Sequence, residues 1–162
     1  MIPYDNTAVR RQDRLLDVAR ACELLRTGEY GVLSMQAEEG GGYGIPLSYV
    51  WDGCGRIYVH CAPEGRKLRA LDRCPEVSFC VVGRTQVHPS KFTTAYESVV
   101  VRCRAVRGLE PAERMQALRL LLEKYSPDDC VTGMRYAEKS FHRTEILRLE
   151  VETVSGKAKR IG

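Results

Sequence analysis

Apolar and polar residues alternate in several short segments, and this period of two predicts a chain built mainly of β-strands. The alternation is clear near the C-terminus, where Leu147, Leu149 and Val151 are separated by charged residues, which predicts one buried and one solvated face. Strands are expected over residues 31–36, 43–51, 56–61, 77–82, 98–106 and 143–154. The residues after 154 are expected to form a basic tail, GKAKR.

A first helix is predicted over residues 18–27, after a polar N-terminal arm that covers residues 1–16. Asp17 suits the N-cap position, because its carboxylate can accept a hydrogen bond from the first turn, and Gly28 suits the stop. The inner face of this helix is expected to hold Val18, Cys22 and Leu25.

Two further helices are expected, a short one after residue 65 and a longer one over residues 111–125. The short helix should end before Pro75, because the residue that precedes a proline disfavours the helical conformation. Pro111 suits the first position of the longer helix. This helix carries an apolar stripe that is expected to face the core and not a cofactor: Met115, Leu118, Leu122 and Tyr125.

These elements predict a mainly β fold, a small antiparallel barrel of about six strands with peripheral helices. The length of 162 residues and the hydrophobic content of 44% suit one domain over residues 1–162. Turns at residues 39–42 and 52–55 connect successive strands, so the order is a meander. The segment 83–97, which contains Pro89, is expected to be a long loop that serves function or an interface.

Charge and hydropathy argue against two classes of partner. The formal net charge is +4 and like charges form only short clusters such as Arg10-Arg11, so no nucleic-acid partner is expected. No apolar segment approaches the roughly 20 residues that cross a bilayer, so no membrane partner is expected. The first residues lack the apolar core of a signal peptide, and a cytoplasmic location is therefore expected.

The seven cysteines do not form a recognisable disulfide or metal pattern. Their number is odd and no CxxC motif occurs, so we expect buried free thiols. Cys54, His60 and Cys61 suggest a zinc site at first sight. His60 and Cys61 are neighbours on a predicted strand, however, and their side chains should point to opposite faces. No metal is expected.

The most informative pair of charges is Arg66-Lys67, which comes just after Gly65 at the start of the short helix. Cations at a helix N-terminus oppose the helix dipole, and they make more sense if a phosphate lies between them and the exposed backbone amides. The alternative is a solvated pair of cations at the end of a loop, and both readings stand on these residues alone.

Several motifs in a fixed order carry a resemblance to a known family. The segments YGIPLSYVW, IYVHCAPEGRKL, CPEVSF and FTTAYESVVVRCRAV, with RRQDR before them and SGKAKR after them, resemble the pyridoxamine 5′-phosphate oxidase-like flavoproteins, especially the nitroimidazole-resistance branch. The resemblance spans nearly the whole chain. It implies an FMN-binding split β-barrel that forms a homodimer, with the flavin at the subunit interface. The flavin of this family is usually FMN and sometimes FAD.

The resemblance also assigns cofactor-binding positions. It implies that residues 45–50 border the flavin ring with their backbone, that His60 and Cys61 face the cofactor from the neighbouring strand, and that Arg66 and Lys67 bind the phosphate. Ser98 matches a polar position contributed across the dimer. The cofactor-binding set is therefore Pro46, Leu47, Ser48, Tyr49, Val50, His60, Cys61, Arg66, Lys67 and Ser98.

One departure from the family narrows the function. The C-terminus LRLEVETVSGKAKRIG lacks the arginine and tryptophan pattern of the true pyridoxamine phosphate oxidases, and Trp51 is the only tryptophan, so oxidation of vitamin B6 is not expected. The resemblance then implies a flavin-dependent oxidoreductase that takes electrons from NADH or NADPH and reduces a small acceptor, including nitroaromatic compounds. The alternatives are a flavin storage module and a haem-binding split barrel with His60, His88 or His142 as the ligand.

Overall fold

Seven antiparallel strands form one sheet, in the order β2-β1-β5-β6-β7-β4-β3. The computed structural model describes residues 1–162. The predicted mainly β class is confirmed, and the number of strands is seven where about six were expected. The strands are β1 (Gly31–Gln36), β2 (Gly42–Leu47), β3 (Val50–Trp51), β4 (Arg56–Cys61), β5 (Glu76–His88), β6 (Thr93–Val106) and β7 (Glu145–Lys159).

The extra strand comes from a break in the segment predicted as one strand, 43–51. β2 and β3 follow each other in sequence but lie at opposite ends of the sheet order, so the chain crosses from one edge to the other at Ser48 and Tyr49. The backbone of Tyr49 leaves the ladder there, and its N–H donates to the Tyr125 hydroxyl over 3.0 Å. This crossing rolls the sheet into a barrel that stays open between β2 and β4, because no ladder joins those two strands.

Four α-helices surround the barrel, with α1 and α3 at the predicted bounds: α1 (Val18–Thr27), α2 (Arg66–Arg73), α3 (Pro111–Tyr125) and α4 (Cys130–Ser140). Asp17 caps α1 as predicted, accepting a 2.9 Å hydrogen bond from the Arg20 N–H. The expected inner face was wrong at Val18, which is 45% exposed, because the buried stripe is centred on Ala21 and Leu24. The sequence did not predict α4. Short 3₁₀ turns cover Gln12–Arg14, Pro89–Lys91, Pro127–Asp129 and Phe141–Arg143.

The predicted stripe of α3 is only partly core. Ala117 and Leu121 are its buried residues, whereas Tyr125 is 39% exposed. The reason is that α3 packs on one side against β3 and β4 and on the other against α4, so no single stripe is fully covered. None of the helices has the length and apolar character needed to cross a membrane.

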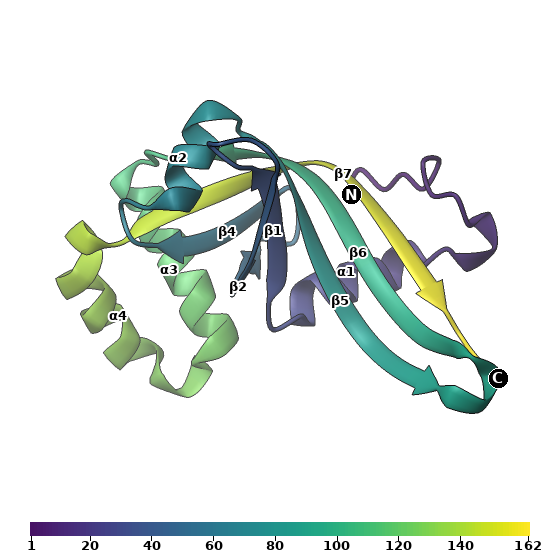
Figure 1. Ribbon diagram of the computed structural model, residues 1–162. Helices are drawn as coiled ribbons and strands as arrows, with labels where there is room; N and C mark the ends of the chain where they lie inside the picture. Colours follow the sequence, from purple (N-terminus) through teal and green to yellow (C-terminus); the bar gives the residue numbers. More distant parts are fainter.

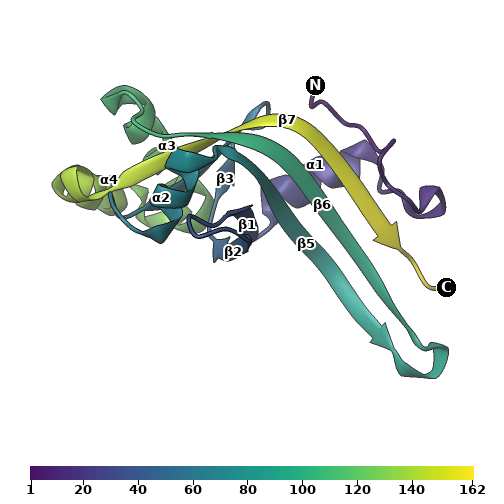
Figure 2. The same cartoon turned by 45° about the horizontal axis from the view of Figure 1, so that its top comes forward.

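A long arm extends from the barrel, where the sequence predicted a loop over residues 83–97. β5 and β6 continue as paired strands through most of that segment, and β7 accompanies them to the pair Tyr96 and Lys159 (Figures 1 and 2). The loop prediction was wrong because pairing of β5 with β6, joined by β7 at Tyr96 and Glu97, compensates for the weak apolar pattern of the segment. The expected basic tail after residue 154 is likewise part of β7.

The main core lies inside the barrel. It contains 23 buried residues, among them Tyr49 and Phe79, whose rings meet edge to face at 5.0 Å. A second cluster of six buried residues lies between β4 and α3, around Tyr58 and Leu121. The N-terminal arm runs beside β7, to which Tyr4 forms a bridge at Val154. The opening of the barrel thus lies between two cores, one inside it and one under α3.

Candidate functional site

The opening between β2 and β4 leads to two cavities. One lies at the start of α2, has a volume of about 190 Å³, and is called the helix-start cleft here. The other lies under α3 and α4, has a volume of about 420 Å³, and is called the apolar pocket. The cleft contains Tyr43 and Ile45 of β2 and Cys61 of β4, and the pocket contains Ser48, which follows β2, and His60 of β4, so each cavity has residues from both sides of the opening.

The helix-start cleft exposes the first turn of α2. Gly65 adopts φ 142° and ψ 173°, a conformation that is essentially restricted to glycine, and no side chain caps the helix. The first N–H groups of α2 therefore have no side-chain acceptor. A β-carbon at Gly65 would have no neighbour within 4 Å, so the space beside these amides is open. The lining residues are Tyr43, Ile45, Cys61, Ala62, Glu64, Gly65, Arg66, Lys67 and Leu68.

The two predicted phosphate-binding cations differ in their surroundings. Arg66 forms a 2.5 Å ion pair with Glu39 and lies over the ring of Tyr43, 4.1 Å from its centroid. Lys67 is half-buried and takes part in no ion pair or side-chain hydrogen bond. A half-buried ammonium without a counter-charge, next to uncapped helix amides, has the chemistry to bind an anion. The cleft thus supports the phosphate reading over the solvated pair.

His60 and Cys61 point to opposite sides of β4, as their adjacency predicts. Cys61 faces the helix-start cleft, and burial raises the pKa of its thiol while nearby Lys67 acts in the opposite direction. His60 faces the apolar pocket. Desolvation, and then the charge of Lys67, lowers the pKa of His60, so its imidazole is neutral near pH 7.

The cysteines are free, but the expectation that they are buried holds only for Cys103. Burial raises the pKa of Cys103 to about 12, so it remains a thiol. Cys54 is exposed in the turn before β4, where the Asp52 carboxylate accepts its N–H over 2.8 Å.

α3 and α4 pack against each other (Figure 1), and residues of both helices line the apolar pocket. Gly133 allows this contact, because a β-carbon there would lie 2.5 Å from Leu122 Cδ2. The hydroxyl of Ser140 donates to the Tyr136 carbonyl over 2.9 Å, so its proton is already used. The lining residues are Ser48, His60, Leu118, Leu121, Leu122, Tyr125, Ser126, Gly133, Tyr136, Ala137, Ser140 and Thr144.

Several polar side chains of this pocket make no hydrogen bond: those of Ser48, His60, Ser126 and Tyr136. Thr144, by contrast, donates to the Ser140 carbonyl over 3.0 Å. Of the free side chains, we single out His60 and Ser48. They also lie on the two sides of the opening, Ser48 after β2 and His60 on β4. A mostly apolar cavity with a few free polar groups at one end is typical of a small-molecule site.

The crossing between β2 and β3 is held by α3. Lys124 Nζ donates to the Tyr49 carbonyl over 2.9 Å and lies 3.7 Å from the centroid of the Tyr49 ring. Burial lowers the pKa of Lys124 to about 8. The Tyr125 hydroxyl also lies 3.0 Å from the Tyr49 carbonyl and 2.5 Å from that of Glu29. Side chains of α3 therefore fix the backbone beside Ser48.

The structure brings most predicted site residues to the opening, but not all side chains are accessible. Pro46 and Ser48 are exposed, whereas Tyr49 and Val50 are buried and Leu47 packs against the core. β2 is an edge strand, so one row of its backbone N–H and C=O groups has no partner in the sheet. A ligand that contacts the backbone of β2 needs such free groups.

Ser98 lies apart from both cavities within one chain. It is on β6, paired with Val82 of β5 and Lys157 of β7. By strand alternation it shares the outer face of the sheet with Val100, because Val99 and Val101 are buried inside. Pro46 lies on the same outer face, because it pairs with Val32 of β1, and Val32 pairs in turn with Cys80 of β5.

The sequence analysis missed Tyr43, which lies under Arg66, and the wall that α4 adds to the apolar pocket. A signal for α4 exists: Met134 and Ala137 have helical spacing, and Pro127 suits the start of a turn. Nothing near Tyr43 in the sequence indicates its contact, since Arg66 belongs to a different element.

Residues 17–158 match the family described as pyridoxamine 5′-phosphate oxidase. A search of curated proteins found no significant match.

Solved structures share the fold at low sequence identity. A candidate 5-nitroimidazole antibiotic resistance protein from Bacteroides thetaiotaomicron has 18% identity and a TM-score of 0.76, over 90% of this chain and 86% of that one. A FAD-binding protein from Mesorhizobium loti has 22% identity and a TM-score of 0.62, over 91% and 98%. A FAD and haem binding protein from Mycobacterium smegmatis has 18% identity and a TM-score of 0.68, over 90% and 72%. These likenesses establish the split-barrel fold.

Proposed function

Because the chain belongs to the pyridoxamine 5′-phosphate oxidase family, we propose that it binds a flavin nucleotide, FMN in the first place and FAD as the alternative, along the opening between β2 and β4. The observation that carries this proposal is the helix-start cleft. Uncapped amides of α2, the unpaired Lys67 and the adjacent Arg66 form a phosphate site at one end of the opening. The glycine conformation at residue 65 leaves room for the phosphate.

The ring end of the flavin lies toward Ser48 and His60, with the backbone of β2 alongside. A bound flavin performs the electron transfer itself. The residues of this chain orient it, keep water out with α3 and α4, and supply His60 as a neutral group that can donate one hydrogen bond and accept another. The protein is on this proposal a flavin-dependent oxidoreductase.

The apolar pocket is the place for the electron acceptor. Its volume of about 420 Å³ and its leucine and tyrosine side chains suit a small, flat, uncharged molecule, a class that includes nitroaromatic compounds. NADH or NADPH is the proposed electron donor. The fold likeness to a candidate nitroimidazole-resistance protein supports this class of acceptor as a proposal.

We propose further that two copies of the chain enclose the flavin. The outer face of the sheet carries exposed apolar side chains, with Val82 55% exposed and Val100 40% exposed beside Ser98. The arm adds Val87 and Phe92, which are 68% and 96% exposed. A partner subunit on this face would bury these side chains and bring its own Ser98 position to the cofactor.

The phosphate site is tested by comparing FMN with riboflavin. Lys67→Met removes the unpaired charge but keeps the length of the side chain. We expect FMN to bind about 10- to 100-fold more weakly, since a charge-assisted contact contributes roughly 1.5–3 kcal/mol, and riboflavin to bind as before. Lys139→Met on the exposed face of α4 is the matched control. Unchanged FMN affinity in Lys67→Met would rule the site out.

Turnover is tested with the purified holoprotein. Steady oxidation of NADH or NADPH in the presence of a nitroaromatic acceptor supports the oxidoreductase, whereas bound flavin without turnover supports the storage module. A Soret band in place of flavin absorption supports the haem protein, for which His60 is the remaining ligand, because His88 and His142 line neither cavity. Mass analysis of the released cofactor separates FMN from FAD.

The interface is tested by Val82→Glu, with Val131→Glu on α4 as the matched control, since Val131 is equally apolar and 70% exposed. A buried carboxylate in the proposed interface should shift the protein toward monomer in sedimentation and release flavin on dilution. A monomer that keeps FMN tightly would show that one chain builds the whole site.

A further inference from the structure

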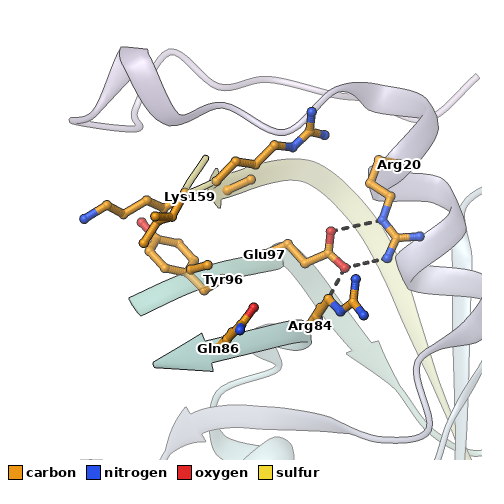
Figure 3. A pocket seen from close by; sticks show the side chains of 10 residues that line it. Arg20, Arg84, Gln86, Tyr96, Glu97 and Lys159 are labelled. Carbon is orange, nitrogen blue, oxygen red and sulfur yellow. Dashed lines mark hydrogen bonds and ion pairs between the residues drawn. The ribbon is translucent and has the colours of Figure 1, made fainter. Parts of the chain in front are cut away.

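A third cavity lies at the base of the arm, and the residues that line it differ from those at the opening between β2 and β4. It has a volume of about 410 Å³ and shares no lining residue with the two cavities described above. Four segments form it: Arg20 of α1, the strands β5 and β6 of the arm, and the end of β7 with the residues after it (Figure 3). We call it the arm groove.

The arm groove occupies the core face of the sheet, beyond the end of the core. Val99 and Val101 of β6 are fully buried on this face, and Glu97 and Ala95 continue the same alternation into the groove. The opposing strand follows through a bulge: Val82 pairs with Ser98, but Thr85 pairs with Tyr96.

The bulge inserts one extra residue into β5 and so reverses which side chains face the core side. Without it, Thr85 and Val87 would point into the groove. With it, Arg84 and Gln86 point there instead, and Val87 remains 68% exposed on the other side (Figure 3). A register irregularity thus turns the guanidinium of Arg84 and the amide of Gln86 toward the groove, where both side chains stay exposed to solvent.

The carboxylate in the groove is already neutralised. Glu97 accepts two hydrogen bonds from the Arg20 guanidinium, at 3.0 and 2.5 Å, and a third from the Arg84 N–H at 3.2 Å. The Arg20 guanidinium lowers the pKa of Glu97, which keeps that pair ionised. Gly83 makes room for it, because a β-carbon there would lie 2.6 Å from Glu97 Oε1.

The remaining cations have no carboxylate partner. The guanidinium groups of Arg84 and Arg160 take part in no hydrogen bond or ion pair, and Lys159 donates only to the Thr93 hydroxyl. The lining residues carry four cations and one carboxylate, and Glu23, outside the lining, also pairs with Arg20 over 2.7 Å, which leaves an excess of two positive charges. Arg84 and Arg160 are exposed to solvent, and an anion between them would relieve their mutual repulsion.

We propose that the arm groove binds a phosphate-bearing small molecule of the nucleotide class, a site separate from the flavin opening. Arg84 and Arg160 bind the phosphate, since guanidinium groups match its oxygens in pairs. The organic part rests on Tyr96 and on Ala95 and Ile161, which also line the groove. Gln86 offers an amide to a polar edge of the ligand (Figure 3).

The test uses adenosine 5′-monophosphate and adenosine as probes, titrated calorimetrically into the flavin-loaded protein. AMP should bind at least 10-fold more tightly than adenosine. The double variant Arg84→Gln/Arg160→Gln should weaken AMP at least 10-fold while the flavin content stays the same. Arg119→Gln/Arg135→Gln removes two exposed, unpaired arginines of α3 and α4 and should leave AMP binding unchanged.

A second measurement needs no variant. Amide NMR shifts on AMP titration should concentrate at Gln86, Tyr96 and Ile161. Equal binding of AMP and adenosine, or undiminished AMP binding in the double variant, overturns the proposal. So does AMP binding that is lost in Lys67→Met, because the probe would then occupy the helix-start cleft. Loss of dimerisation in the double variant with no AMP binding to the wild type would assign the groove to a partner subunit instead, and would also overturn it.

Discussion

The helix-start cleft and the arm groove both gather cations, but they are built in different ways. In the cleft, neighbours in sequence, Arg66 and Lys67, stand at the start of a helix whose own amides add donors. In the groove, the cations come from separate segments, and the backbone contributes a bulge and no free helix end. A cationic site can therefore be formed by neighbours in the sequence, or it can be assembled from distant segments only when the chain folds.

The two sites also treat their carboxylates differently. Glu39 pairs with Arg66 at the exposed rim of the cleft, where both side chains are about half exposed. Glu97 pairs with Arg20 inside the groove, and its side chain is only 14% exposed. An exposed ion pair such as Arg66–Glu39 is weak, so an incoming anion can replace its carboxylate. The less exposed, bidentate pair Arg20–Glu97 is stronger and is a fixed part of the groove lining.

The largest expected effect concerns the glycine of the cleft. Gly65→Ala places a β-carbon in open space but on a backbone with φ 142°, so the strain of about 1–3 kcal/mol must be relieved by moving the start of α2. We expect FMN affinity to fall at least 10-fold in a fluorescence titration, while AMP binding in the groove stays unchanged. Unchanged FMN affinity would show that the helix start does not hold the phosphate.

The corresponding glycine of the groove should act through packing. Gly83→Ala would place a β-carbon 2.6 Å from Glu97 Oε1 and 2.9 Å from Leu24 Cδ1, and Arg20 prevents Glu97 from moving freely. Chemical denaturation should report a loss of about 2 kcal/mol of unfolding free energy. Flavin content should be retained, and a variant as stable as the wild type would contradict the fixed position of Glu97.

The ion pair of the groove should depend on pH. Glu97 has a lowered pKa in the folded protein, so its contribution is full above the ordinary value of about 4.5 and is lost as the pH falls through the folded value. Glu97→Gln should therefore cost about 1–2 kcal/mol at pH 7. The difference in unfolding free energy from the wild type should vanish in acid, and a difference that persists there would point to packing.

The smallest effect is expected at the rim of the cleft. Glu39→Gln frees Arg66 from its exposed pair, which contributes about 0–1 kcal/mol. FMN should bind up to about fivefold more tightly, and the gain should shrink at high salt, since exposed charges are screened. Weaker FMN binding would mean that Glu39 holds Arg66 in its working position.

Local sequence patterns correctly predicted those helices and strands whose bounds depend on interactions within the element. α1, α3, β1 and β4 have the expected bounds, because capping residues, a proline and apolar periods act within the element itself. The failures lie where distant residues intervene. Tyr125 and Lys124 hydrogen-bond to the backbone groups of Tyr49 and split one predicted strand. Pairing of β5 with β6, joined by β7 only at Tyr96 and Glu97, turns a predicted loop into the arm.

The sequence by itself determined a mainly β chain and a pair of cations at the start of α2, since strand alternation and a helix beginning are properties of neighbouring residues. Only the tertiary structure decided that β2 and β3 occupy opposite edges, so that the barrel opens beside His60. It also decided that Arg84 and Arg160 share a groove. The physical reason is that register and closure depend on which strands pair, and pairing joins residues that no local pattern relates.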